Sequence, residues 1–211
     1  WYAADQSTDV PTGFSNSLKI TSNGANTPAA GAYIFFTQKI EGFNSAHLEF
    51  GTSNAKTITI SFHIKSSLTG TFGGSIRNSA QNRSYPFSFT ISSANTWEYK
   101  TVTFAGDTGG TINDDSGNGQ YLAFTLAAGS DMRTTDNTSW SAYASGKLGY
   151  GHTTAANAVM TTTNATWQVT GVQLEVGDTA TDFEHRTFAD ELVKCQRYFT
   201  IDKAGSGGQF K

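Results

Sequence analysis

The chain has 211 residues, a formal net charge of −3 and a single cysteine, and only 15% of its residues are charged. This length suffices for one large β-domain with a buried core, and the charge content is far from that of a disordered chain. The balance of charge argues against a nucleic-acid-binding surface, no apolar stretch approaches the ~20 residues that span a bilayer, and one cysteine forms no internal disulfide.

Strand-like alternation of apolar and polar residues recurs along the chain. The clearest case is 56–67, where Ile58, Ile60, Phe62 and Ile64 share one face and polar residues, His63 among them, share the other. About eight to ten such runs without intervening helices predict an all-β fold, a jelly-roll-type antiparallel β-sandwich. The expected strands lie within residues 16–22, 32–40, 46–51, 56–67, 84–93, 97–107, 119–129 and 165–178.

The last of these runs changes parity. Trp167 and Val169 fall on one face, whereas Leu174 and Val176 fall on the opposite one. A β-bulge at Thr170–Gly171 would restore a single inward face, because an inserted residue resets the alternation and glycine accepts the dihedral angles required. We therefore expect a bulged final strand with Trp167 in the core, and we also expect Trp97 to be a core residue.

A short helix follows the strands. Thr187 with Asp190 three residues later fits a helix N-cap, and Phe188, Leu192, Cys195 and Phe199 recur at helical spacing. A helix of about a dozen residues is marginal alone in water, so it needs an apolar partner. The expected organisation is a β-sandwich over 1–183, an elbow and helix over 184–200 that serve assembly, and a Gly/Ser-rich linker or the start of another module over 201–211.

Several segments carry a family resemblance. TGVQLEVGDTATDFEHRTFADELVKCQRYF (170–199), together with 6–21, 38–67 and 92–108, resembles a family of tail-fibre and other virion appendage domains of marine and cyanobacterial bacteriophages. The resemblance implies a sandwich similar to carbohydrate-binding modules, a location in the virion, a homotrimer among other virion proteins, and recognition of host surface polysaccharide. Related sequences often place a tryptophan where this chain has His63.

The elbow and helix have two interpretations. The helix could pack on its own sandwich, or against equivalent helices around a threefold axis. In the second case Glu184 and Arg186 would form inter-subunit ion pairs, and Phe188, Leu192 and Phe199 would supply the apolar contact.

Exposed aromatic side chains are the candidate ligand-binding residues. Indole and phenol rings stack on the C–H faces of sugars, and neighbouring polar groups bind the hydroxyls. The long polar segment 134–152 carries Trp140, Tyr143 and Tyr150, and His63 lies on an outward strand face. For Trp140 and Tyr143, anchoring of the loop is an equal alternative to ligand or subunit contact.

A calcium loop is a further hypothesis. Asp114, Ser116 and Asn118 alternate before Gly119 like the oxygen ligands of calcium loops, although Thr125 stands where a bidentate glutamate would be expected. The alternative, which we favour, is a polar hairpin turn that binds no ion. No other cofactor is expected.

Enzymatic chemistry has little support in the sequence. Neither a G-x-S-x-G nor an H-E-x-x-H motif occurs, and Cys195 falls on the apolar side of the expected helix, as a packing residue would. Five loop aspartates could converge as glycosidase carboxylates: Asp107, Asp114, Asp115, Asp131 and Asp136. We therefore favour a non-enzymatic virion module over a carbohydrate-binding module attached to an enzyme, and both over a glycan depolymerase.

Overall fold

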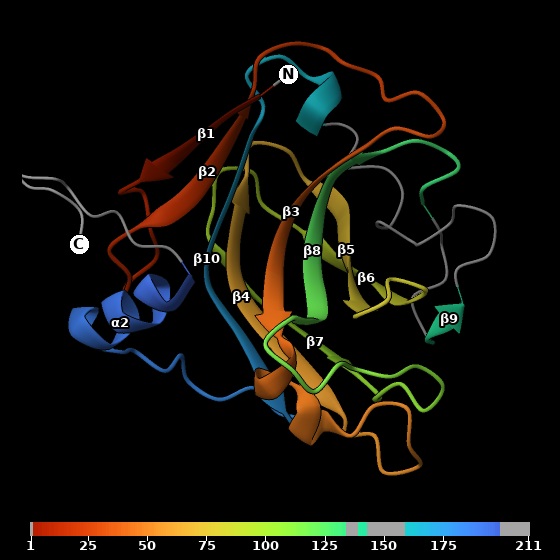
Figure 1. Cartoon of the computed structure of the whole chain (residues 1–211). Helices are drawn as coiled ribbons and strands as arrows, with labels where there is room; N and C mark the ends of the chain where they lie inside the picture. Colours follow the sequence, from red (N-terminus) through yellow and green to blue (C-terminus); the bar gives the residue numbers. More distant parts are fainter. Residues whose placement is uncertain (1, 134–138, 143–158, 199–211) are drawn as a thin grey trace, which may run out of the picture. The chain divides into compact units, whose positions relative to one another are not determined.

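Two five-stranded antiparallel sheets form the domain in the computed structural model, which describes residues 2–133, 139–142 and 159–198 (Figure 1). Along the first sheet the order is β1 (Tyr2–Ser7), β2 (Ser17–Ser22), β10 (Thr166–Val176), β4 (Ile58–Ser66) and β7 (Glu98–Phe104). Along the second it is β3 (Tyr33–Glu41), β8 (Asn118–Ala128), β5 (Gly70–Asn78), β6 (Arg83–Ile91) and β9 (Ser141–Ala142). Neighbours such as β2 and β10 are far apart in sequence, as jelly-roll sandwiches require, and the predicted fold class is confirmed.

The core lies between the two sheets. The four apolar residues that alternate along β4 are fully buried. Phe62, in the middle of β4, meets Phe89 of β6 and Phe124 of β8 edge-on, with 5.0 Å between ring centroids in both pairs. Trp167 of β10 is 1% exposed and contacts Phe124, so its predicted inward position is confirmed.

Two sequence-based expectations differ from the structure. Residues 46–51 form no strand: η1 (Gly42–Asn44) and η2 (Ala46–Leu48) are 3₁₀ turns, and Glu49 ends the second with a φ of 55°. The buried pair Leu48 and Phe50 imitates strand alternation in this segment. Trp97 lies outside the core, where its indole Nε1 donates a hydrogen bond to Asp9 Oδ1 over 3.1 Å.

The predicted β-bulge in β10 is confirmed. The register between β10 and β4 shifts between Thr170 and Gln173, and Gly171 has a φ of 59°. A Cβ on Gly171 would lie 2.6 Å from Cζ of Phe14, a residue of the β1–β2 loop. Glycine at this position therefore serves both the bulge and the close approach of the loop.

The chain divides into two compact units, Trp1–Thr181 and Asp182–Lys211. In the described part of the second unit, α2 (Phe188–Tyr198) begins as predicted: Thr187 Oγ1 accepts the backbone N–H of Asp190 and donates to its carboxylate. The residues of α2 are all exposed. Among the described residues, no helix has both the length and the apolar character to cross a membrane.

Replacing Gly171 by alanine should destabilise the domain by about 2 kcal/mol, because the new Cβ meets Phe14 and the left-handed backbone disfavours it. Gly177→Ala is the control: this glycine also has a positive φ, of 114°, but a Cβ there would meet nothing within 4 Å. Urea unfolding measures both variants. Equal losses would contradict the steric role of Gly171.

Candidate functional site

The outer side of the second sheet carries an unusual set of side chains. Along β3, Ile34 and Phe36 pack against the core, so Tyr33 and Phe35 point away from it. Tyr121 of β8, the strand next to β3, and Arg77 of β5, the strand after that, face the same side and are cross-strand partners. We call this set the aromatic face; it consists of Tyr33, Phe35, Thr37, Lys39, Arg77 and Tyr121.

The rings and cations of the aromatic face form a continuous series of contacts. Tyr33 and Phe35 stack with 5.2 Å between centroids and 14° between planes. The Arg77 guanidinium lies 5.3 Å from the Phe35 centroid and 5.5 Å from that of Tyr121. Lys39 Nζ lies 5.9 Å from the same Tyr121 ring. The series crosses three strands, and it is open at one end, where Tyr33 is 43% exposed.

The β5–β6 turn positions Arg77, whose side chain is buried. Arg77 Nη1 donates a hydrogen bond of 2.8 Å to Oε1 of Gln81, which has a φ of 53°. The side chain of Asn78 holds this turn in shape by accepting the backbone N–H groups of Asn82 and Arg83. The turn therefore sets the plane of the guanidinium between the two rings.

Two hydroxyl groups lie buried on the same side of the sheet. Ser75 Oγ and Thr125 Oγ1 have no hydrogen-bond partner among the residues that the structure describes. Ser75 pairs with Ala123, and Thr125 pairs with Gly73, so each hydroxyl has a small residue as one of its two cross-strand neighbours. An unpartnered buried hydroxyl costs about 1–3 kcal/mol, which makes these positions costly for stability alone.

Trp140 is held against the core. Its Nε1 donates to the carbonyl oxygen of Ala105 over 2.7 Å, and its ring contacts Phe50 and Tyr85 edge-on. This placement favours the anchoring alternative for Trp140. Tyr143 and Tyr150 lie outside the described residues.

His63 lies on the outer side of the first sheet, packed between two rings. Its centroid is 5.1 Å from that of Phe14 and 5.0 Å from that of Tyr99. Burial lowers the pKa of His63, and its buried Nδ1 has no hydrogen-bond partner within the described part of the chain. The imidazole thus holds the β1–β2 loop and offers no open platform for a ligand.

Asp9 fastens the same loop to the first sheet. Its carboxylate accepts hydrogen bonds from Lys65 Nζ, at 2.6 Å, and from Trp97 and Gln168. The Lys65 ammonium is the main cause that lowers the pKa of Asp9. Together with Phe14, this anchor covers the part of the first sheet where a tryptophan at position 63 would lie.

The segment proposed as a calcium loop forms a hydrogen-bonded turn. Asp115 Oδ1 accepts the N–H of Gly117, whose carbonyl oxygen accepts the N–H of Gly42. Asp114 and Ser116 are exposed, and Asn118 begins β8. These contacts favour the polar-turn alternative. The described residues contain no group of three or more His, Cys, Asp or Glu side chains that could hold a metal ion.

Asp107 has a structural partner. Both of its carboxylate oxygens accept hydrogen bonds of 2.6 Å from Arg83, and its side chain has no exposed surface. The pair raises the pKa of Arg83. A carboxylate bound on both oxygens by a guanidinium is poorly placed to act as a general acid or base. Of the other loop aspartates, Asp131 is exposed and Asp136 lies outside the described residues.

The ions expected at a subunit interface pair within their own unit. Arg186 contacts Glu184 at 3.2 Å and Glu191 at 3.3 Å. The hydrogen bond to Glu191 is the main cause that raises the pKa of Arg186. Phe188 is 81% exposed and Leu192 42%. Cys195, expected to pack, is also exposed, and Phe199 lies outside the described residues.

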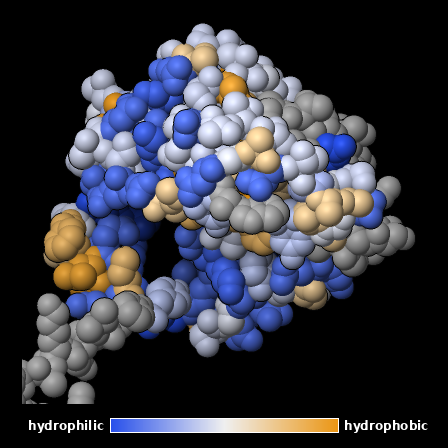
Figure 2. Space-filling model, turned by 90° about the horizontal axis from the view of Figure 1, so that it is seen from above, coloured by the Kyte–Doolittle hydropathy of each residue, from blue (hydrophilic) through white to orange (hydrophobic). Residues whose placement is uncertain are grey.

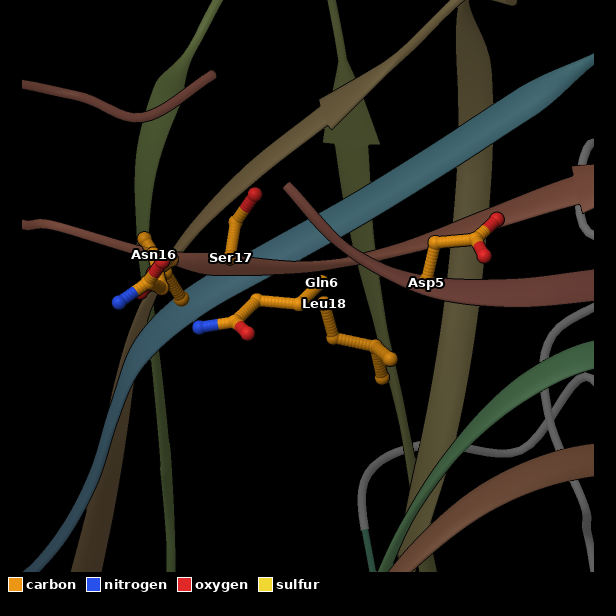
Figure 3. A pocket seen from close by; sticks show the side chains of 6 residues that line it. Asp5, Gln6, Asn16, Ser17 and Leu18 are labelled. Atoms are coloured by element: carbon orange, nitrogen blue, oxygen red, sulfur yellow. The ribbon is translucent and has the colours of Figure 1, made fainter. Parts of the chain in front are cut away.

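A shallow depression of about 350 Å³ lies beside β1 and β2 (Figure 3). Gln6 and Leu18 point to one side of the hairpin, and Asp5 and Ser17 point to the other. The Ser17 hydroxyl donates to the carbonyl oxygen of Asp9 and helps to hold the loop. The depression brings together no aromatic rings, so we prefer the aromatic face as the candidate site.

Reading the sequence for loop aromatics missed the aromatic face. The signal was present in YIFFTQK (33–39), where two aromatic residues, a threonine and a lysine occupy the outward parity of one strand. No signal in the sequence could have paired that strand with β8, whose residues lie about 85 positions further along, as in the pair Gln38–Leu122.

In sequence, the chain matches no protein-family model and no curated protein. Among solved structures it is similar to the enzymatically active domain of tailspike protein 4 of bacteriophage CBA120, with 16% identity and a TM-score of 0.45, covering 83% of this chain and 18% of that one. It is also similar to a CBM4 module, with 17% identity and a TM-score of 0.42 over 83% and 78% of the two chains. The CBM22-1 xylan-binding domain of Paenibacillus barcinonensis Xyn10C shares 8% identity, with a TM-score of 0.37 over 85% and 83%.

With every TM-score at 0.45 or lower, these similarities carry no argument about function. The chain spans 18% of the tailspike domain's length, so the tailspike's activity says nothing of this chain. The resemblance to virion appendage domains remains a prediction from the sequence.

Asp107→Asn should lower the free energy of unfolding by about 3 kcal/mol, because it leaves the Arg83 guanidinium without its charged partner. Glu49→Gln is the control, since it removes an exposed ion pair, Lys56–Glu49, and should cost ~0–1 kcal/mol. Chemical denaturation distinguishes the two. A loss for Asp107→Asn no greater than that for Glu49→Gln would show that the Asp107–Arg83 pair is not structural.

Proposed function

We propose that the chain is a non-enzymatic glycan-binding module of a virion appendage, which contacts host surface polysaccharide through the aromatic face and assembles as a homotrimer with other virion proteins. The stacked pair Tyr33–Phe35 on β3 is the observation that carries this proposal: Tyr33 is exposed, Phe35 is half-buried, and the buried side chains of Arg77 and Tyr121 continue the series behind them. The sequence resemblance supports the virion setting.

The aromatic face has the chemistry that sugar recognition requires. Aromatic rings present flat apolar surfaces to the C–H faces of pyranose rings, and polar groups beside them bind the hydroxyls. Here the outward positions of β3 supply two rings, then Thr37, then Lys39. From Tyr33 to Lys39 this row extends over roughly 20 Å at the rise of a β-strand, long enough to contact several consecutive sugar units.

The carboxylates near this face support binding without hydrolysis. Glycosidases place two carboxyl groups about 5 to 9.5 Å apart across the scissile bond. Among the charged residues on the described strands of the second sheet, Glu41 is the one acid, and it is buried at the end of β3. Asp107, one of the loop aspartates that could have served as a glycosidase carboxylate, is bound by Arg83. A module attached to an enzyme is the alternative, and a depolymerase is less well supported.

The second unit supports assembly. Phe188, Leu192 and Cys195 follow the four–three spacing of a coiled-coil seam, and Phe199 continues it in sequence. Phe188 and Leu192 are exposed in the single chain, and an 11-residue helix is marginal alone. The face of the molecule in Figure 2 is largely hydrophilic, with apolar side chains in small separate groups. Three copies of α2 packed around a threefold axis would bury the apolar seam of Phe188, Leu192 and Cys195.

Tyr33→Ala should weaken glycan binding at least tenfold, because it removes the exposed ring of the stacked pair. Tyr2→Ala is the control, since Tyr2 is 44% exposed on β1, outside the aromatic face. A printed glycan array identifies ligands, and affinity electrophoresis in soluble polysaccharides compares the variants. The proposal would be contradicted if neither the wild-type chain nor its variants bound any glycan, or if both variants lost the same affinity. Release of reducing ends from the polysaccharide would also contradict it.

Leu192→Asp should convert the trimer to a monomer, because it places a charge in the helix seam. Val193→Asp is the matched control: it introduces the same charge on the adjacent residue, which is 68% exposed and lies off the seam. Sedimentation equilibrium of the full chain gives the masses. A wild-type monomer, or dissociation of both variants alike, would refute assembly through α2.

A further inference from the structure

We infer that the aromatic face binds acidic glycans, in which Lys39 contacts a carboxylate or sulfate group carried by the sugar. This inference rests on the proposed function and names its ligand class. Its basis is the distribution of charge over the second sheet.

The strands of the second sheet carry an excess of cations. Their charged residues are Lys39, Arg77, Arg83 and the single acid Glu41. Arg83 is neutralised by Asp107, which lies outside the strands. The chain as a whole has a formal net charge of −3, so the cationic character of this sheet is local and opposite to that of the molecule.

Lys39 is the accessible cation of the aromatic face. Its residue is exposed, and it lies at the far end of the outward row from Tyr33, on the edge strand of the sheet. The lysine–carboxylate ion pairs among the described residues involve Lys56, Lys65 and Lys100, and none involves Lys39. The contact of Lys39 in the structure is with the Tyr121 ring, which leaves the ammonium able to bind an anion.

Tyr121 brings the two cations of the face together. Lys39 Nζ lies 5.9 Å from the ring centroid, and the Arg77 guanidinium lies 5.5 Å from it. Two like charges around one ring repel each other, although the ring attracts each of them. An anion bound at Lys39 would be attracted to its ammonium, whereas a neutral sugar would gain only stacking and hydrogen bonds. The site thus favours a sugar with a negative substituent over its neutral counterpart.

The test compares polymers that differ only in charge. One arm uses polygalacturonate and the same polymer after carboxyl reduction, and a second uses a sulfated galactan and its desulfated form. Binding of the full chain is measured by affinity electrophoresis and isothermal titration at 50 and 500 mM NaCl. We expect at least tenfold tighter binding to the charged member of one pair, and a loss of that preference at high salt, since screening shortens the range of charge interactions.

Lys39→Gln should lower the affinity for the charged polymer about five- to tenfold and leave binding to its neutral counterpart unchanged. Lys19→Gln is the matched control, because Lys19 is a strand lysine on the first sheet, and it should bind like the wild type. A preference for polygalacturonate over its reduced form would identify a carboxylate ligand, and a preference for the sulfated galactan over its desulfated form would identify a sulfate ligand.

The outcomes separate this inference from the proposed function. Equal binding to charged and neutral members of both pairs would overturn the inference and leave the glycan-binding function standing. An effect of Lys19→Gln as large as that of Lys39→Gln would also overturn it, by showing non-specific electrostatics. Failure to bind any of the four polymers, together with a blank glycan array, would refute the proposed function itself.

Discussion

The contact of Phe62 with Phe89 and Phe124 is the constraint on which the other features depend. It joins the middle of β4 to the middle of the opposite sheet through two edge-to-face ring pairs. Side chains alternate with period two along a strand. An inward position of these three rings therefore determines to which side of the sheet the remaining side chains of their strands point. A slip of one residue in β8 would turn Tyr121 inward and bring Phe124 to the surface. The aromatic face is therefore a consequence of the core.

The two outer surfaces of the sandwich are used differently. On the first sheet, the β1–β2 loop lies over the strands, held by Asp9 and by Phe14, whose approach depends on the bulge at Gly171. On the second sheet, the rings of β3 are partly accessible. A chain with tryptophan at position 63 would need room for a larger side chain where Phe14 now packs on the imidazole. Histidine at position 63 and the fastened loop therefore fit each other.

Features that depend on residues close together in the sequence could be predicted, whereas those that depend on distant strands could not. The alternation of β4, the β10 bulge and the Thr187 cap are local, and the sequence predicted all three. Residues 46–51 were misread because two buried residues two positions apart occur in a 3₁₀ turn as well as in a strand. The aromatic face could be foreseen only in part, since Tyr33 and Phe35 share a local pattern with Lys39, whereas their contact with Arg77 depends on long-range pairing. His63 was judged by its outward parity and by the family resemblance, and neither gives information about a loop that covers the face.

The energetics of the second sheet indicate selection for something other than stability. Ser75 and Thr125 bury hydroxyls without partners, although alanine and valine would fill the same positions without that cost. Arg77 places a guanidinium in a site that is 1% exposed, where an apolar side chain of similar volume commonly gives equal or greater stability. Three such departures lie on the outer side of adjacent strands of one sheet, and a fourth, the buried amide of Gln120, lies at the inward-facing start of β8. Natural proteins concentrate departures of this kind where they bind or react, because there the gain in function offsets the loss of stability. The same reasoning separates the aromatic face from Trp140, whose indole N–H is hydrogen-bonded and whose ring packs on Phe50 and Tyr85, as stability alone explains.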